Sequence, residues 1–302
     1  MVILSAYFFL FGIVVGSFLN VCISRIPEGL SIVSPGSRCP RCLTPIKPYD
    51  NVPIFGWLWL GGKCRSCKLP ISPMYPLIEM TTGLVFVACF LRFGFTAETA
   101  KWIVFSCLLV VLAITDVRVR ILPDVVNWPG FAAGMIFSFF VPVNDGSGYV
   151  FGVRILHRPL PETAVSVLDA ALGALFGSMF LWGVATLYRA VRGREGMGLG
   201  DVKMMALVGA FVGLRGTFLT ILLGTLLGSI LGVLVILGIF LSGWKKPVAV
   251  RASRRGLGTP SALHWAIASR YQLPLGTFLA VGALTVMFFF AGSPSHGGML
   301  IR

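Results

Sequence analysis

The sequence predicts an all-α polytopic membrane protein with about eight transmembrane helices and a small cytoplasmic loop domain that resembles a zinc ribbon. The first observation behind this prediction is composition. Of 302 residues, 56% are hydrophobic and only 12% are charged, whereas soluble domains are about 25% charged. The second is that most basic residues gather in alternate connecting loops. The third is that four of the seven cysteines form two Cys-x-x-Cys pairs within one loop.

The predicted helices correspond to apolar runs, each near the roughly 20 residues that a bilayer requires. They cover residues 2–24, 74–91, 102–115, 125–142, 165–188, 204–215, 217–242 and 273–291. Two of these runs, 102–115 and 204–215, are short, and each abuts an aspartate. We therefore expect their ends to face a polar cavity rather than lipid.

The first apolar run is expected to stay in the protein as a membrane helix. A cleavable signal peptide would need a basic start and a small-residue cleavage site, and the uncharged stretch from Met1 to Ser24 has neither. Gly12 and Gly16 place small residues one turn apart on one helix face. Such a face is suited to close packing against a second helix.

Loop charge predicts the orientation of the chain. With the first loop inside, the inner loops 25–73, 116–124, 189–203 and 243–272 carry 7, 2, 4 and 6 Lys or Arg residues, which is 19 of the 25. The positive-inside rule then places the N-terminus outside and the loop 25–73 in the cytoplasm. It also places Asp116 and Asp201 on the same cytoplasmic side. The basic loop 243–272 is either solvated or in contact with anionic lipid headgroups.

The loop 25–73 is rich in Pro and Gly and is too small to bury much apolar surface, so it needs a staple. Four thiols supply one: Cys39, Cys42, Cys64 and Cys67, with 21 residues between the two pairs. This spacing is typical of a tetrahedral structural zinc site. The alternatives are disulfides or a redox motif, and a cytoplasmic location disfavours disulfides.

The stretch from Gly196 to Met205 is the first candidate for chemistry. Asp201 follows Gly198 and Gly200, where a basic loop gives way to an apolar run. An acid at the mouth of a membrane segment is costly to keep and is a functional candidate. The glycines permit close approach of another backbone. The alternative is an ordinary polar loop, because Gly-x-Gly alone is a weak pattern.

Asp116 stands in a matching position, directly after the run 102–115. Two aspartates on one membrane face suggest an aspartyl protease pair, in which two close carboxylates share a proton. One carboxylate takes a proton from a water, and the other donates to the carbonyl oxygen or leaving amine. The pair titrates as a unit, so the two roles stay unassigned. We expect a substrate strand to lie beside Asp201, so a bulky residue in place of Gly200 should abolish cleavage.

Three other acids have two readings each. Glu79 lies one turn into the second apolar run and is either a structural partner of a basic residue or a site residue between loop and membrane. Asp124 follows Pro123 and is either a solvated acid or a cap of the fourth helix. Asp169 is read as an interfacial acid rather than a catalytic one, and the preceding outer loop 144–163 has no interpretable motif.

The combination of motifs resembles the type IV prepilin leader peptidases, which are peptidase/N-methyltransferases of type IV pilus and type II secretion systems. Gly-x-Gly-Asp alone is shared with other intramembrane aspartyl proteases, so the specificity lies in the combination. The matching residues are Gly16-Ser-Phe-Leu-Asn-Val21, Arg25, Pro27, both Cys-x-x-Cys pairs, Asp50-Asn-Val-Pro53, Trp57, Ile71-Ser-Pro73, Tyr75-Pro-Leu-Ile-Glu79, Asp116, Leu122-Pro-Asp124, Gly198-Leu-Gly-Asp201-Val-Lys203 and Leu273-Pro-Leu-Gly276.

The resemblance implies two activities in the bacterial inner membrane. The family removes the basic leader from prepilins and pseudopilins on the cytoplasmic side, then methylates the new N-terminal amine with S-adenosylmethionine. Carried over, Asp116 and Asp201 are the catalytic pair, and the four cysteines form a structural zinc site in the methylation region. Gly198, Gly200, Lys203 and Glu79 are implied as substrate-binding residues, with Glu79 near the methyl-transfer site.

The expected parts are a first transmembrane helix (1–24), a cytoplasmic tetracysteine domain (25–73) and a transmembrane peptidase bundle (74–302). The expected partners are prepilins, pseudopilins and membrane lipid, and a homo-oligomer stays open. The net charge of +14 is assigned to cytoplasmic loops rather than to nucleic-acid binding. Two alternatives remain: a non-catalytic scaffold or transporter with a zinc loop, which has no need of Asp116 and Asp201, and a peptidase without methylation.

Overall fold

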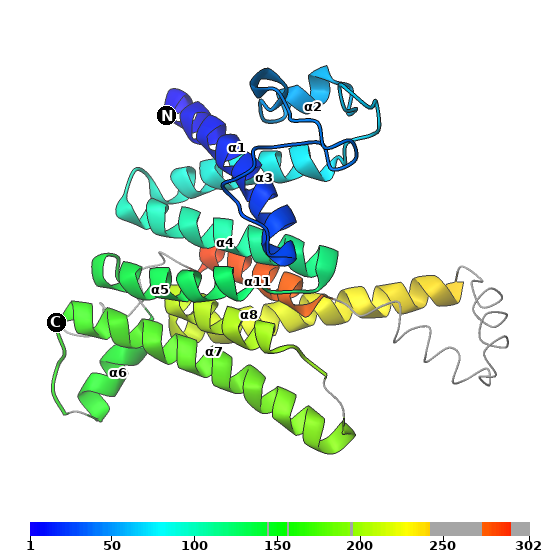
Figure 1. Ribbon diagram of the computed structural model, residues 1–302. Helices are drawn as coiled ribbons and strands as arrows, with labels where there is room; N and C mark the ends of the chain where they lie inside the picture. The colour runs from blue at the N-terminus through cyan, green and yellow to red at the C-terminus, as the bar shows by residue number, and fades with distance from the viewer. Residues whose placement is uncertain (144, 156, 194–195, 242–273, 291–302) are drawn as a thin grey trace, which may run out of the picture.

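A computed structural model describes residues 1–143, 145–155, 157–193, 196–241 and 274–290, and helices dominate this part of the chain (Figure 1). Within these ranges no β-strand occurs. The long helices are α1 (Val2–Arg25), α3 (Met74–Phe93), α4 (Ala97–Val119), α5 (Asp124–Phe140), α7 (Glu162–Arg192), α8 (Leu199–Leu241) and α11 (Leu275–Phe289). The short elements are α2 (Phe55–Trp59), α6 (Ser147–Arg154) and the 3-10 turns η1 (Ile26–Glu28) and η2 (Pro48–Asp50).

Five helical segments are long and apolar enough to cross a membrane: Val2–Glu28, Met74–Phe93, Ala97–Val119, Glu162–Arg192 and Leu199–Val235. The all-α, multi-pass architecture is therefore confirmed. The expected count of about eight spans is not, because α5 and α11 have only 17 and 15 residues. The runs 204–215 and 217–242 correspond to the two arms of α8, which meet at a break at Gly213 and together give only one candidate span, Leu199–Val235. The basic loop 243–272 lies outside the described residues.

Helix α8 reverses its direction near its middle. Gly213 interrupts the helix with φ 73° and ψ −174°, a conformation that favours glycine. A Cβ built on Gly177 of α7 would lie 2.8 Å from the carbonyl oxygen of Met205 and 2.8 Å from a methyl of Thr217. In a straight helix those two residues would be about 18 Å apart. Both arms of α8 therefore pack against the same face of α7.

The N-terminal helix packs closely on α3. A Cβ on Gly12 would lie 2.8 Å from the Cα of Gly83, and a Cβ on Gly16 would lie 2.8 Å from the Cα of Glu79. The packing face predicted from these two glycines is thus confirmed. Phe8 and Phe90 stack beyond this contact, with ring centroids 4.6 Å apart.

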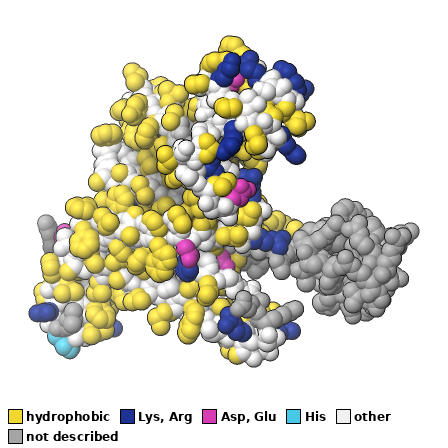
Figure 2. Space-filling view, viewed as in Figure 1, with side chains coloured by type: hydrophobic (Ala, Val, Ile, Leu, Met, Phe, Trp, Pro, Cys, Tyr) yellow, Lys and Arg dark blue, Asp and Glu magenta, His cyan; other side chains and the backbone are white. Residues whose placement is uncertain are grey.

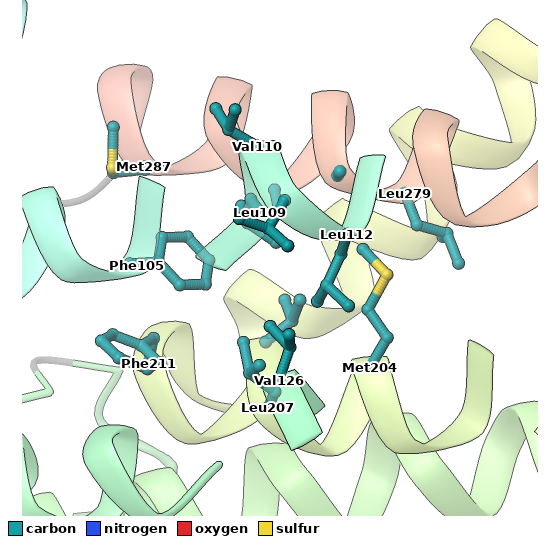
Figure 3. Packing of buried hydrophobic residues seen from close by; sticks show 14 of the residues in the cluster. Phe105, Leu109, Val110, Leu112, Val126, Met204, Leu207, Phe211, Leu279 and Met287 are labelled. Carbon is teal, nitrogen blue, oxygen red and sulfur yellow. The ribbon is translucent and has the colours of Figure 1, made fainter. Parts of the chain in front are cut away.

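The main core forms around α4. Phe105, Leu109 and Leu112 are fully buried and face side chains from both α8 and α11 (Figure 3). Phe105 stacks on Phe211 of α8 with centroids 4.8 Å apart, and Leu279 of α11 closes the cluster. This packing fixes the ends of α4, α8 and α11 relative to one another, and the candidate acids lie at those ends.

The molecular surface separates by residue type (Figure 2). Hydrophobic side chains cover most of the visible helical body, as expected for surfaces that face lipid. Basic side chains gather on the projecting loop domain, where Arg65 forms a two-contact ion pair with Asp50 at 2.6 and 2.7 Å. This distribution agrees with a multi-pass membrane protein that carries a small polar domain.

Candidate active site

Asp116 lies in the last turn of α4, which continues to Val119, beyond the apolar run that predicted it. The helix ends at Arg120, whose left-handed backbone lets its N–H donate to the Asp116 carbonyl at 2.9 Å. The Asp116 side chain is only 7% exposed. The Asp116 carboxylate is therefore buried inside the bundle, about one turn before the backbone leaves α4 at Arg120.

Thr277 holds the Asp116 carboxylate from the opposite direction. Its backbone N–H donates to Oδ2 at 2.8 Å, and its hydroxyl lies 3.2 Å from the same oxygen and 3.0 Å from the Ala113 carbonyl. Thr277 belongs to the first turn of α11, where backbone N–H groups have no partner within the helix. Asp116 thus caps α11, and a negative charge there interacts favourably with the helix dipole.

Sequence reasoning missed Thr277. It is uncharged, and 161 positions separate it from Asp116. The available signal was its position directly after the Leu273-Pro-Leu-Gly276 motif, because a proline just before a helix marks an N-terminus with free N–H donors.

Asp201 is in the first turn of α8, directly after Gly200, and the backbone next to each acid contacts the same side chain, that of Leu122. The structure therefore brings together the two acids that the sequence singled out. Leu122 fills the space beside both acids. A Cβ on Gly200 would meet the Leu122 Cβ at 2.9 Å, and a Cβ on Gly276 would meet Leu122 and the Asp116 Oδ2 at 3.0 Å each. These two glycines are required by packing.

Gly198 differs from Gly200 in its surroundings. A Cβ on Gly198 would meet nothing closer than the Gly200 nitrogen at 3.9 Å. The backbone at Gly198 is therefore accessible, whereas Gly200, directly before Asp201, is packed against Leu122. This open backbone is the part of the stretch that an extended peptide could approach.

Lys203 contacts another acid of the same region. Its ammonium lies 2.8 and 2.6 Å from the two carboxylate oxygens of Asp124, the first residue of α5. The expected cap at this position is wrong, because Asp124 makes no capping hydrogen bond and Pro123 occupies the N-cap position. The ion pair instead joins the start of α5 to the start of α8, on either side of Leu122.

The four cysteines predicted as metal ligands lie together in the loop domain. All four sulfurs lie within 4.8 Å of one another. The Sγ atoms of Cys39 and Cys67 are 3.9 Å apart, as are those of Cys42 and Cys64. These separations are far beyond a disulfide bond. They match the roughly 3.8 Å between sulfurs that each lie about 2.3 Å from a tetrahedral zinc.

The two Cys-x-x-Cys turns share one local geometry. Leu43 and Lys68, each directly after the second cysteine of a pair, have φ near 60° and donate their N–H to the first cysteine's carbonyl. Hydrogen bonding with Thr44 lowers the pKa of Cys42 to about 6. A hydrogen bond with the Leu69 backbone lowers the pKa of Cys67, but burial and the other three cysteines outweigh it and raise that pKa to about 11. The fit to a tetrahedral metal ion therefore rests on the two turns and the sulfur positions.

Glu79 joins the loop domain to the membrane helices. Its carboxylate accepts the Ile54 N–H at 2.7 Å, and Ile54 has φ 61°, which is strained for a β-branched residue. Glu79 is 7% exposed and lies against Gly16 of α1. The contacts of Glu79 thus involve the loop domain and α1, and not the pair formed by Asp116 and Asp201.

Comparison with known proteins gives matches over most of the chain. Residues 10–93 match the Bacterial Peptidase A24 N-terminal domain, and residues 103–233 match the Type IV leader peptidase family. No significant match to a solved structure was found.

Several curated relatives share the name "Prepilin leader peptidase/N-methyltransferase". The chain is 38% identical to one from Myxococcus xanthus over 77% of this chain and 63% of the relative, so the match spans just under two thirds of that relative's length. It is 36% identical to one from Pseudomonas aeruginosa, over 75% of this chain and 79% of the relative. It is 32% identical to one from Stutzerimonas stutzeri, over 92% of this chain and 88% of the relative.

Proposed function

Because the chain belongs to the type IV leader peptidase family, we propose that it cleaves leader peptides from prepilins and pseudopilins and N-methylates the new N-terminal residue. The observation that supports the peptidase half is that the ends of α4 and α8, which carry Asp116 and Asp201, meet at Leu122. A scaffold or transporter is not favoured, since such a protein has no need for two neighbouring acids at this position.

The two aspartates act as one acid–base pair on the scissile peptide bond. A neighbouring pair of carboxylates holds one proton between them. The unprotonated carboxylate takes a proton from water as the water oxygen attacks the carbonyl carbon. The protonated one donates to the carbonyl oxygen. As the C–N bond breaks, the first carboxyl passes the proton that it took from water to the leaving amine, and the second recovers its proton from the tetrahedral hydroxyl. Thr277 orients Oδ2 of Asp116 during these transfers.

The substrate approaches along the open backbone before Asp201. Gly198 faces open space and is the point of approach, whereas Gly200 allows Leu122 to pack beside Asp201. An extended peptide there would place its carbonyl beside the acid pair. Lys203 serves this site through Asp124, since both oxygens of that carboxylate face its ammonium.

Cys39, Cys42, Cys64 and Cys67 hold a structural zinc ion in the loop domain. Zinc supplies the folding free energy that a loop with little buried apolar surface lacks. S-adenosylmethionine is the methyl donor, consistent with the methyltransferase name of the relatives. We assign Glu79 to this half of the protein because its carboxylate holds the loop domain against α3.

The proposed topology follows from loop charge. The N-terminus lies outside, and the loop domain and acid pair face the cytoplasm of a bacterial inner membrane. The parts are the first transmembrane helix (1–24), the tetracysteine domain (25–73) and the peptidase bundle (74–302). Lipid surrounds the apolar body, and no nucleic acid takes part.

The experiment that tests this proposal uses purified protein in lipid with a prepilin and labelled S-adenosylmethionine. Leader removal and label transfer are followed together for the parent, Asp116→Asn, Asp201→Asn and Cys39→Ser. We expect both Asn variants to lose cleavage and the Cys variant to retain it while losing label transfer. Normal cleavage by either Asn variant would refute the acid pair, and the scaffold alternative would replace it.

A further inference from the structure

A second pair of buried acids lies at the end of the bundle away from Asp201. Asp145, between α5 and α6, is 7% exposed, and Asp169 of α7 is 1% exposed. Gly213, where α8 reverses, lies against Asp145: a Cβ on Gly213 would fall 2.7 Å from the Asp145 Cβ. From Asp201 to Gly213 is about 18 Å of helix, so this pair is separate from the candidate active site.

Asp145 caps the second arm of α8. After the break at Gly213, the N–H groups of Leu214 and Arg215 donate to the two Asp145 oxygens at 3.1 and 2.9 Å. A restarting helix has such N–H groups without partners of its own, and a carboxylate there also interacts favourably with the helix dipole. Asp145 therefore stabilises the reversal of α8.

Asp169 plays the same part for α6. Its Oδ1 accepts the Gly148 N–H at 2.5 Å, in the first turn of that helix, and lies 2.6 Å from the Ser147 hydroxyl. The Ser147 hydroxyl also lies 2.7 Å from Oδ2 of Asp145. One serine thus bridges two carboxyl groups that each cap a different helix.

Counting hydrogens shows that the bridge needs one more proton than serine supplies. A hydroxyl donates one hydrogen bond and accepts others, so Ser147 can donate to only one carboxyl group. The second short contact then requires a hydrogen on the other carboxyl, because the serine oxygen and a carboxylate oxygen repel at this distance when no hydrogen lies between them. The Oδ2 atom of Asp169 is also buried without a partner, which a neutral acid tolerates far better than a carboxylate does.

We propose that Asp145, Ser147 and Asp169 form a proton-binding clamp that holds one shared proton and fastens α6 and α7 to the reversal of α8. The proton belongs to the pair rather than to one residue. When the proton leaves, the Ser147 hydroxyl can donate to only one of the two carboxylates, and the negative charges of Asp145 and Asp169 repel each other. The clamp is therefore pH-sensitive.

The charges around the clamp agree with this assignment. Burial raises the pKa of Asp145, and the charge of Asp169 raises it further. The hydrogen bonds from the Ser147 hydroxyl and the Arg215 N–H lower it, as does the charge of Arg215. Helix α6 contributes the neutral groups of Ser147 and Gly148. A raised pKa means that the clamp's stabilisation is complete at low pH and is lost as pH rises through the raised value.

Infrared spectroscopy of the whole protein in detergent, with isotope-labelled aspartate, tests the shared proton directly. At neutral pH we expect the carbonyl band of protonated carboxyl groups to decrease by one equivalent in both Asp145→Asn and Asp169→Asn. Glu162→Gln, which removes an exposed acid from the same helix as Asp169, is the matched control and should leave the band unchanged. A band at the parent level in both Asn variants would overturn the proposal.

Hydrogen exchange in the unmutated protein gives a second readout that does not depend on variant folding. The amides of Gly148, Leu214 and Arg215 are expected to lose about tenfold protection per pH unit as the pH rises from the ordinary aspartate pKa of 3.8 to the raised pKa of Asp145, and to level off above it, after correction for base-catalysed exchange. Corrected protection that shows no fall as the pH rises from about 4 would contradict a clamp that holds a proton in the folded state.

Discussion

The ion pair between Asp124 and Lys203 gives the sharpest test of how the candidate active site is held. Removing either charge with Asp124→Asn or Lys203→Gln frees the start of α8 from the start of α5. The side chains of Lys203 and Asp124 are 32% and 55% exposed. Water therefore screens the pair, and its loss should change the free energy of unfolding by less than about 1 kcal/mol.

The effect on cleavage should be larger than the effect on stability. Asp201 lies two positions before Lys203, and a misplacement of about 1 Å at a reacting group can cost about 100-fold in rate. A partial shift should lower kcat about 10-fold, which is about 1.4 kcal/mol, with KM nearly unchanged. The double variant should lose about 10-fold rather than the roughly 100-fold expected of independent sites.

Steady-state cleavage of a prepilin by the four proteins of this cycle is the assay, with Glu28→Gln as a control that removes an exposed carboxylate elsewhere. If Lys203 bound the substrate directly, Lys203→Gln would raise KM while Asp124→Asn changed little. That result, or losses that multiply in the double variant, would refute the positioning role.

Three further predictions concern other parts of the molecule. Gly276→Leu should reduce cleavage at least 100-fold with the protein still inserted, because its side chain would overlap Leu122 and Asp116 Oδ2; cleavage near the parent rate would contradict this packing. Chelation of the metal, or Cys39→Ser, should release about one zinc per chain and expose the loop domain to protease. Elemental analysis and proteolysis measure these effects. A metal-free parent that resists protease equally well would argue against a zinc site. Hydrogen bonding with Arg65 lowers the pKa of Asp50 from its ordinary 3.8, so the pair stabilises the loop domain above that pH and is lost as pH falls through the lowered value. Asp50→Asn should therefore speed proteolysis of the loop at pH 7, and the acceleration should disappear at a pH below the lowered pKa of Asp50. Equal acceleration at both pH values would contradict this.

Sequence alone was sufficient for the features that depend on local pattern. Asp116 and Asp201 were recognisable because an acid beside an apolar run is costly, and the cysteines because their spacing matches a metal site. The helices α1, α3, α4, α5 and α7 also lie where apolar runs predicted them.

Features that depend on tertiary contact were not predictable in the same way. Nothing local indicates that Leu122 fills the space beside Gly200 and Gly276, or that Lys203 faces Asp124 rather than solvent. The outer loop showed no motif, yet it contains α6 and Asp145. Asp145 acts only where α8 reverses, and the sequence gives no local sign of that contact.

The bond between Asp116 and Thr277 has a consequence for biosynthesis. Thr277 lies beyond the residues 10–93 and 103–233 that match known families, and it is made long after α4 has left the ribosome. Both acids can be in the membrane while α11 is still being synthesised, but the Asp116 carboxylate has no Thr277 N–H to orient it. The order of translation thus leaves the Asp116 carboxylate without this hydrogen bond until α11, the last described helix, has been made.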